Sequence, residues 1–231
     1  QDRHGQSARR FRLRIAMTTS PESLSDQAYE LVERMIVTLE LPPGSVFSEG
    51  DLSKRVGIGR TPLREALQRL SSDRLVVAVP RRGILVTEIN VSEYLSMLET
   101  RMVLDRLIAE QAARRATPEE RRELREIATS IVEASLNEDS GAFMKLDMTC
   151  DRILEKASRN PYAYQAVTSM HAHCRRFWSV HQHHASLLES AQLHATIMKM
   201  VANGDSEGAG AASDALLNYL ITFTRTALDL D

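Results

Sequence analysis

The chain has 231 residues, of which 43% are hydrophobic, and a formal net charge of −2. This length and apolar fraction are sufficient for two packed domains. No run of about 18 or more apolar residues is present, so no transmembrane helix is expected. Two cysteines, Cys150 and Cys174, are too few for a disulfide framework, which favours a reducing, cytoplasmic compartment.

The first sixteen residues are basic, with five arginines and no apolar segment of the kind that a secretory signal needs. Two interpretations stay open for this stretch. It is either a disordered arm that touches DNA or extra sequence ahead of a natural start at Met17. In both cases residues 1–24 are expected to lie outside the folded domains.

Charge is unevenly distributed along the chain. Residues 1–89 contain 14 Lys and Arg against 11 Asp and Glu, whereas residues 90–231 contain 15 against 20. A local excess of basic residues is typical of a surface that meets phosphate groups. The N-terminal part is therefore the candidate for nucleic-acid binding.

Two helices are expected before residue 57. An apolar stripe at helical spacing predicts a helix over residues 27–39, which the segment Leu41-Pro-Pro-Gly44 ends. Ser48 and Asp51 then resemble a capping box, with Asp in place of the usual Glu. They predict a short helix that runs to about Val56.

The next segment, residues 57–70, combines a glycine turn, a helix start and two arginines one turn apart. On a helix Arg60 and Arg64 leave the same face, where each can bind the O6 and N7 acceptors of a guanine. The opposite side is apolar and predicts a buried face, formed by Leu63, Ala66, Leu67 and Leu70. An ordinary amphipathic helix with solvated arginines is the alternative.

Two β-rich runs follow, residues 75–79 and 84–87, around Pro80-Arg-Arg-Gly83. This pattern predicts a hairpin with an arginine tip. Helices that meet at a glycine-containing turn form a helix-turn-helix, and a hairpin beside it is a wing. Residues 25–89 are thus predicted to form a winged helix-turn-helix of three helices and a β-hairpin.

Residues 27–87 resemble the winged-helix domain of the GntR family of bacterial transcription regulators. The resemblance rests on the glycine-proline turn, the recognition-helix segment and the wing, namely Leu41-Pro-Pro-Gly44, Leu52, Val56-Gly-Ile-Gly-Arg-Thr-Pro-Leu-Arg-Glu-Ala-Leu67, Leu70, Leu75 and Arg82-Gly83. It implies contacts of the recognition helix with bases and phosphates and of the wing with the minor groove, through Arg60, Thr61, Arg64, Arg81, Arg82 and Gly83. Gly50 stands where some members carry a further DNA-binding arginine, which bears on half-site preference.

From residue 90 onward the signals are almost all helical. Caps and breakers predict about six helices, over residues 92–116, 117–136, 142–158, 160–181, 186–202 and 205–228. The expected fold is therefore mainly α, with the winged helix followed by an all-α bundle over residues 90–231. This order is similar to that of the GntR branch with an FCD (FadR C-terminal) effector domain.

The FCD resemblance also implies site residues in the bundle. Arg101, with Asp105 one turn later, resembles the arginine that faces an anionic effector. Asp147 and His194 resemble two of the four ligands of a divalent metal, but Asp151 and Leu216 stand where the other two, both histidines, are expected. Asp147, Asp151 and His194 are thus predicted either to bind Zn, Ni or Mn or to be simple surface groups.

Histidines near the end of the fourth bundle helix raise a second metal hypothesis. His171, Cys174, Trp178 and His181 fall on one helical face, and His173, Phe177 and His184 fall on another. The first face has ligands that suit zinc, although a partly exposed helix with solvated histidines is the more common case.

Taken together, the sequence predicts a transcription regulator, usually a repressor, and not an enzyme. A homodimer would bind a pseudo-palindromic operator, and a small carboxylate effector, with or without a metal, would control the affinity for DNA. The rival hypothesis is a metal-dependent hydrolase or lyase with an accessory DNA-binding-like domain. A third is a DNA-binding dimer whose effector pocket has decayed.

Overall fold

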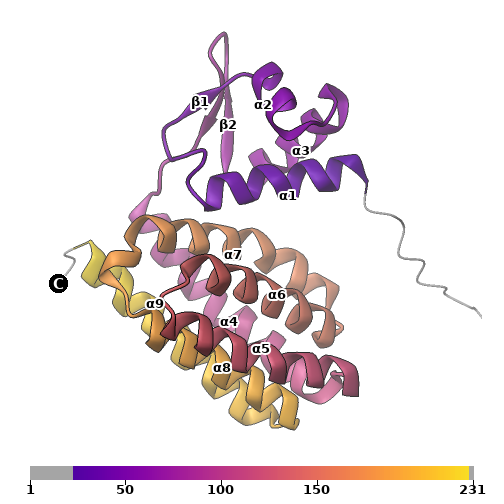
Figure 1. Cartoon of the computed structure of the whole chain (residues 1–231), viewed down its shortest axis with the longest axis vertical. Coiled ribbons are helices and arrows are strands. Elements are labelled where there is room, and N and C mark those ends of the chain that lie inside the picture. Colours follow the sequence, from indigo (N-terminus) through magenta and orange to yellow (C-terminus); the bar gives the residue numbers. More distant parts are fainter. Residues whose placement is uncertain (1–22, 229–231) are drawn as a thin grey trace, which may run out of the picture.

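The computed structural model describes residues 23–228, so nearly all of the predicted N-terminal arm, residues 1–24, lies outside the described residues. Figure 1 shows two parts, an upper one with three helices and a small sheet and a lower bundle of helices. Each part has its own hydrophobic core. The mainly α fold predicted from the sequence, a winged helix followed by a helical bundle, is confirmed for the described residues.

Helix α1 (Leu24–Val37) begins three residues before the predicted start and also ends earlier. The reason is a capping box at its N-terminus that was not predicted from the sequence. The hydroxyl of Ser23 accepts the backbone N–H of Asp26, and the Asp26 carboxylate accepts the backbone N–H of Ser23. Both bonds satisfy donors that the first helical turn leaves free.

Helices α2 (Glu49–Val56) and α3 (Arg60–Ser72) form the helix-turn-helix as predicted. Ser48 caps α2, but the pair with Asp51 is not a full capping box, because the Asp51 carboxylate accepts the Ser48 hydroxyl instead of a backbone N–H. Gly57 ends α2 in the left-handed region with φ 72°, a conformation that glycine adopts at little cost. The turn therefore depends on a glycine at this position.

The wing belongs to an antiparallel sheet in the order β1-β3-β2, formed by Val46–Phe47 (β1), Val76–Val79 (β2) and Gly83–Val86 (β3). The sequence predicted β2 and β3 but not β1, since two residues carry no periodic signal. Gly83 has φ 113°, and a Cβ atom there would lie 2.5 Å from the carbonyl oxygen of Phe47. Only glycine allows β1 to approach β3 this closely.

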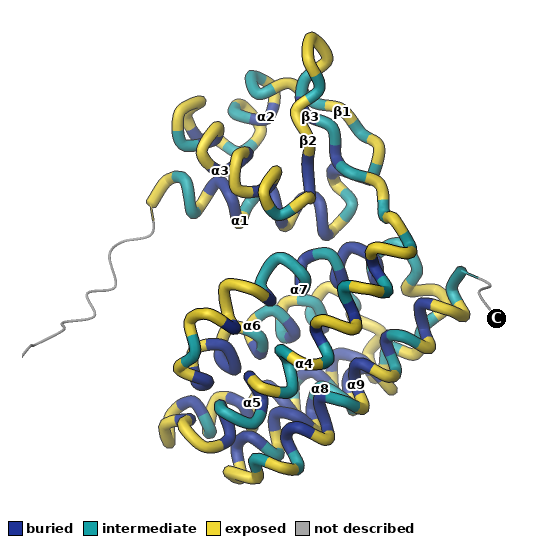
Figure 2. Tube along the Cα trace, turned by 180° about the vertical axis from the view of Figure 1, so that it is seen from behind, coloured by how far each residue is buried: buried dark blue, intermediate teal, exposed yellow. Residues whose placement is uncertain are grey.

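Six α-helices of the described chain form the bundle: α4 (Val91–Arg115), α5 (Pro118–Leu136), α6 (Ser140–Ser158), α7 (Pro161–His181), α8 (Leu187–Asn203) and α9 (Ser206–Ala227). A 3-10 turn, η1 (Gln182–His184), connects α7 to α8. Asn90 caps α4, so this helix begins one residue before the predicted range 92–116. Figure 2 shows buried faces turned toward the bundle interior and exposed faces outward. None of the described helices is long and apolar enough to cross a membrane.

Helix α7 joins the two parts, and in Figure 1 it lies along the side of the bundle that faces α1. Its Ala172 is fully buried in the core of the winged helix. Nε2 of His173 lies 2.8 Å from the carbonyl oxygen of Asp73, and Arg176 donates to the carbonyl oxygen of Thr87 at 2.9 Å. The opposite face of α7 belongs to the bundle, so the same helix contacts both cores.

Candidate functional site

The recognition helix α3 presents the predicted residues on its free side. Arg60, Thr61 and Arg64 are exposed, whereas the predicted anchor residues are all buried, namely Leu63, Ala66, Leu67 and Leu70. Nε of Arg64 donates to a carboxylate oxygen of Glu49 on α2 at 2.7 Å, and the Arg64 side chain is still 62% exposed. An ion pair in such a position contributes only about 0–1 kcal/mol, so a phosphate or base can replace it at low cost.

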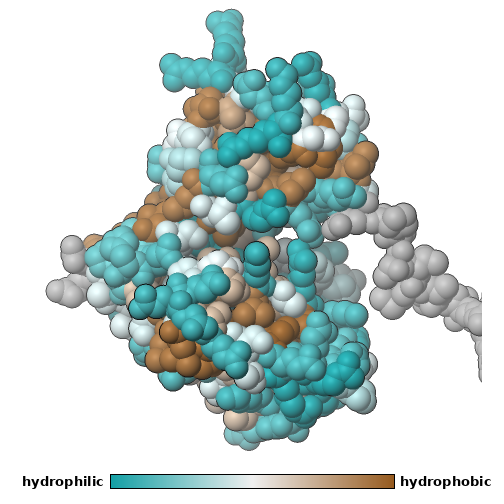
Figure 3. Space-filling view, in the orientation of Figure 1, coloured by the Kyte–Doolittle hydropathy of each residue, from teal (hydrophilic) through white to brown (hydrophobic). Residues whose placement is uncertain are grey.

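The wing tip also carries its predicted basic residues at the surface. Arg81 and Arg82 are exposed in the turn between β2 and β3, and Arg81 has a left-handed backbone with φ 63°. Figure 3 shows hydrophilic side chains that project from the molecule at this end. The wing and α3 therefore supply arginines that are accessible to a nucleic acid.

A cavity of about 80 Å³ lies inside the bundle between α4, α6, α7, α8 and α9. Its wall has two chemically distinct sections. One is charged and is formed by Arg101, Asp105, Asp147, Asp151, Glu155, His171, Arg175 and His194. The other is largely apolar and includes Ile108, Phe143, Leu154, Trp178, Ile197, Leu216, Leu217 and Leu220.

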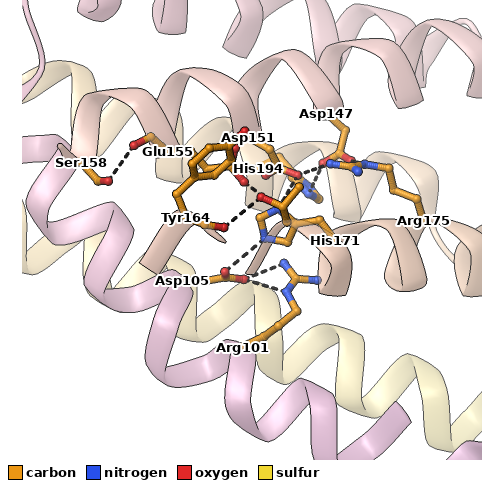
Figure 4. A network of polar contacts seen from close by, with 11 residues as sticks. Arg101, Asp105, Asp147, Asp151, Glu155, Ser158, Tyr164, His171, Arg175 and His194 are labelled. Atoms are coloured by element: carbon orange, nitrogen blue, oxygen red, sulfur yellow. Dashed lines mark hydrogen bonds and ion pairs between the residues drawn. The ribbon is translucent and has the colours of Figure 1, made fainter. Parts of the chain in front are cut away.

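Arg101 lines this cavity, as predicted, but it already has an intramolecular partner. Its Nε and Nη2 donate to one oxygen of Asp105 at 2.9 and 2.6 Å. The other oxygen of Asp105 lies 3.2 Å from Nε2 of His171 on α7. Asp105 thus holds the Arg101 guanidinium in a fixed orientation at the cavity wall (Figure 4).

The three predicted metal ligands lie together, with an arginine among them that the sequence reading missed. Arg175 of α7 donates through Nε to Asp147 at 3.0 Å and through Nη2 to Asp151. Nε2 of His194 lies 3.0 Å from the second oxygen of Asp147, and Nδ1 of His171 lies 3.0 Å from Asp151. Figure 4 shows the two carboxylates between these basic side chains.

The electrostatics of the cluster favour its charged forms. Burial disfavours charge on His171, but the carboxylates of Asp151 and Asp105 raise its pKa well above the ordinary value. Burial likewise opposes the charge of His194, and Asp147 raises its pKa. For Asp151 burial is outweighed by His171 and Arg175, which lower its pKa. Opposite shifts of this kind are typical of ion pairs.

One carboxyl group of the cavity behaves differently. Burial raises the pKa of Glu155, although a hydrogen bond with His171 acts in the opposite direction. Two arginines and two histidines face three aspartates and Glu155 in this section of the wall.

The predicted metal site remains a prediction, but its donor groups are engaged. Within residues 23–228 no group of three or more His, Cys, Asp or Glu side chains is arranged to hold a metal ion. Arg175 contacts both carboxylates, and Leu216 lines the cavity without a donor atom. The residues present thus do not fit a divalent metal at this place.

The suggested zinc face of α7 has other contacts. His171 pairs with carboxylates, Cys174 is a buried free thiol at the cavity, and the ring of His181 packs against Phe177 with centroids 4.5 Å apart. The sequence did contain a signal for Arg175, since it lies one turn after His171 on a buried helix. A charged side chain at that spacing needs a partner, and the partner comes from α6.

Comparison with known proteins gives the family. A profile of the FCD domain matches residues 96–219, more than half of the chain, and one of the bacterial regulatory proteins of the gntR family matches residues 24–86. The chain belongs to the GntR family. This membership makes it a transcription regulator, not the hydrolase or lyase considered from the sequence.

Individual relatives agree with this assignment. The HTH-type transcriptional repressor RspR of Escherichia coli is 29% identical over 92 residues, 40% of each chain. A putative L-lactate dehydrogenase operon regulatory protein of the same species is 25% identical over 89% of this chain and 88% of its own length. The first curated relatives are matched over only 26–50% of their lengths.

Among solved structures, E. coli McbR/YncC superposes with a TM-score of 0.77, covers 87% of this chain and 97% of its own, and is 18% identical. At that identity the likeness supports the fold, a winged helix joined to a helical bundle. For this GntR-family regulator the DNA-binding part and the FCD part are therefore established, and the cavity lies within the FCD part.

Proposed function

We propose that this GntR-family regulator is a homodimeric repressor whose affinity for a pseudo-palindromic operator is controlled by a small carboxylate bound in the FCD cavity. The proposal rests on the presence of two arginine-containing surfaces in one chain. The first is the set of exposed arginines on α3 and the wing, and the second is the wall of the buried cavity, which contains Arg101. A relative named as a repressor, RspR, supports the sign of regulation.

The shape and charge of the cavity indicate the class of ligand. An engineered cavity of about 150 Å³ accommodates benzene, so the volume of about 80 Å³ here suits an acid of roughly two to four carbons. The Arg101 guanidinium in the wall favours an anionic group, and the apolar section favours a short hydrocarbon body. A compact monocarboxylate satisfies both conditions.

Helix α7 provides the route from the cavity to the DNA-binding part. Its residues His171 and Arg175 line the cavity, while Ala172 and Arg176, one position further along, contact the winged helix. A ligand that shifts or rotates α7 would change the placement of the two recognition helices in a dimer. Such coupling requires different ligand affinities in the two arrangements, typically about 1–3 kcal/mol.

The single tryptophan of the chain makes the ligand test direct. Trp178 lines the cavity, and its indole N–H has no hydrogen-bond partner within the described residues. Titration with C2–C4 mono- and dicarboxylates should change the Trp178 fluorescence for the acids that bind. Acids of six or more carbons serve as the size control, because they exceed the cavity.

The regulatory test uses DNA chosen by the protein itself. Selection from a random duplex library should yield an inverted repeat, bound by two copies of the chain in sedimentation experiments. The acid found by fluorescence should then release this DNA from the wild type but not from Arg101→Ala. Release from Arg101→Ala at an unchanged acid concentration would remove Arg101 from the ligand site, and selection of no sequence would contradict operator binding.

A further inference from the structure

Arg175 holds the position between the two carboxylates that a divalent cation would need. Its Nε lies 3.0 Å from Asp147, and its Nη2 contacts Asp151 on the same face of α6. The Arg175 side chain is only 10% exposed, so it cannot reach solvent without leaving these partners. Bidentate contact with two carboxylates is a geometry that the planar guanidinium group favours.

The histidine on the other side of Asp147 has no free lone pair in this arrangement. Nε2 of His194 lies 3.0 Å from Asp147, and Nδ1 lies 2.7 Å from the carbonyl oxygen of Ser190. Since carboxylate and carbonyl oxygens accept hydrogen bonds, both ring nitrogens donate. A metal ligand needs an unprotonated nitrogen, so His194 would have to give up one of these contacts.

Charge within the cluster points in the same direction. The Arg175 guanidinium already lies between Asp147 and Asp151 and pairs with both carboxylates. A divalent ion placed between the same carboxylates would lie beside this guanidinium in a buried environment, where like charges repel strongly. The metal could enter only if Arg175 moved away.

We propose that the Arg175 guanidinium is the resident cation of the FCD cavity and that this regulator holds its anionic ligand without a divalent metal ion. The anionic ligand rests on the function proposed above, whereas the role of Arg175 rests on contacts with Asp147 and Asp151 alone. The guanidinium groups of Arg175 and Arg101 then both line the cavity. They hold the anionic ligand by N–H donation, in place of coordination by a Lewis-acidic metal ion.

Metal uptake by an Arg175 variant tests the proposal without DNA or effector. The full chain is dialysed against EDTA and titrated with Zn²⁺, Ni²⁺ or Mn²⁺ by calorimetry. Wild type should take up no stoichiometric metal and keep its Tm. Arg175→Gln frees Asp147 and Asp151, so it should bind one ion per chain, with a rise in Tm of about 5–10 °C at 100 times Kd.

Matched controls test whether metal is excluded by the positive charge at residue 175 and whether the loss of any arginine would have the same effect. Arg175→Lys keeps a positive charge and should take up no metal, and Arg122→Gln removes an exposed arginine of α5 and should behave as wild type. Arg175→Gln with Asp151→Asn removes one ligand and should lose the gained ion. If Arg175→Gln does not fold alone, refolding with Zn²⁺ should restore its far-UV circular dichroism.

Three results would overturn the proposal: one metal ion per wild-type chain, no uptake by a folded Arg175→Gln protein, or no recovery of an unfolded one with Zn²⁺. Failure of the proposed function would look different, because it would show as an absence of operator selection or of carboxylate binding. The metal titrations remain readable in either case.

Discussion

The arginines of the two halves of this regulator lie in opposite surroundings. The Arg64 side chain of the recognition helix is 62% exposed and pairs with the half-buried carboxylate of Glu49, whereas the Arg175 side chain of the bundle is 10% exposed and contacts two carboxylates. An exposed guanidinium can exchange its partner for a phosphate or a base edge. A buried guanidinium that pairs with two carboxylates is instead a fixed structural group of the cavity.

The energetic difference between these settings is large. Exposed pairs such as Arg64 with Glu49 contribute about 0–1 kcal/mol. Removal of one partner from a buried pair costs about 3–5 kcal/mol, because the remaining charge is left without compensation. The comparison therefore predicts that substitutions in the bundle act on stability and those in the winged helix act on binding.

The largest effect is expected for Asp151→Ala. This change leaves Arg175 with one carboxylate and deprives His171 of a close ion-pair partner. The free energy of unfolding should fall by about 3–5 kcal/mol, measured by urea denaturation. Glu49→Ala is the exposed counterpart and should cost less than about 1 kcal/mol. Equal losses in the two variants would remove the distinction between the halves.

Arg64→Ala should show the reverse behaviour. Loss of a base contact is expected to weaken binding to the selected operator by about 1–3 kcal/mol, measured by fluorescence anisotropy at fixed salt. Its free energy of unfolding should stay within about 0.5 kcal/mol of wild type. Arg122→Ala, an exposed arginine on α5, is the control and should leave DNA affinity unchanged. An operator affinity equal to wild type would exclude Arg64 from base recognition.

The same contrast explains what the sequence could predict. The helix-turn-helix and wing arise from neighbouring residues, so the positions of Arg60, Arg64 and the wing tip could be read from a continuous segment. Strand β1 was missed because two residues give no periodic pattern, and its place depends on Gly83 of a distant segment. Local signals thus described most of the DNA-binding part.

The cavity could be predicted only in part, since it is assembled from side chains of several helices. Resemblance indicated Arg101, Asp147 and His194, and the structure places them around one cavity. Arg175 lies one turn after His171, but its carboxylate partners depend on the packing of α7 against α6, which no local pattern encodes. The unexpected aspartate at 151 becomes understandable once its arginine partner is known.

A smaller effect is expected at the boundary between the halves. Arg176 is buried and donates to the carbonyl and hydroxyl oxygens of Thr87, just after the wing. Arg176→Met should reduce the coupling between carboxylate and DNA by about 0.5–2 kcal/mol, measured as the ratio of operator affinities with and without the acid. Arg152→Met removes an exposed pair with Glu30 across the same boundary and should have less effect. Full coupling in Arg176→Met would exclude this route.

The smallest effect is expected for an ion pair whose exposure lies between those of the surface pairs and the cavity pairs. The Glu120 carboxylate is buried, accepts the backbone N–H of Thr117 and pairs at 2.9 Å with Arg159, whose side chain is 40% exposed. Burial alone would raise its pKa, but the backbone bond and Arg159 lower it below the ordinary value of 4.5. Because the folded-state pKa is depressed, the stabilisation is present above about pH 4.5 and is lost as the pH falls through the folded-state pKa.

Glu120→Gln should therefore lower the free energy of unfolding by about 1 kcal/mol at pH 7, and the difference from wild type should shrink at acid pH. Glu119→Gln is the matched control, since this neighbour pairs with Arg122 at the surface and should change little at any pH. A difference that grows on acidification would contradict the sign of the pKa shift. A loss of 3 kcal/mol or more would instead place this half-exposed pair with the buried ion pairs of the cavity.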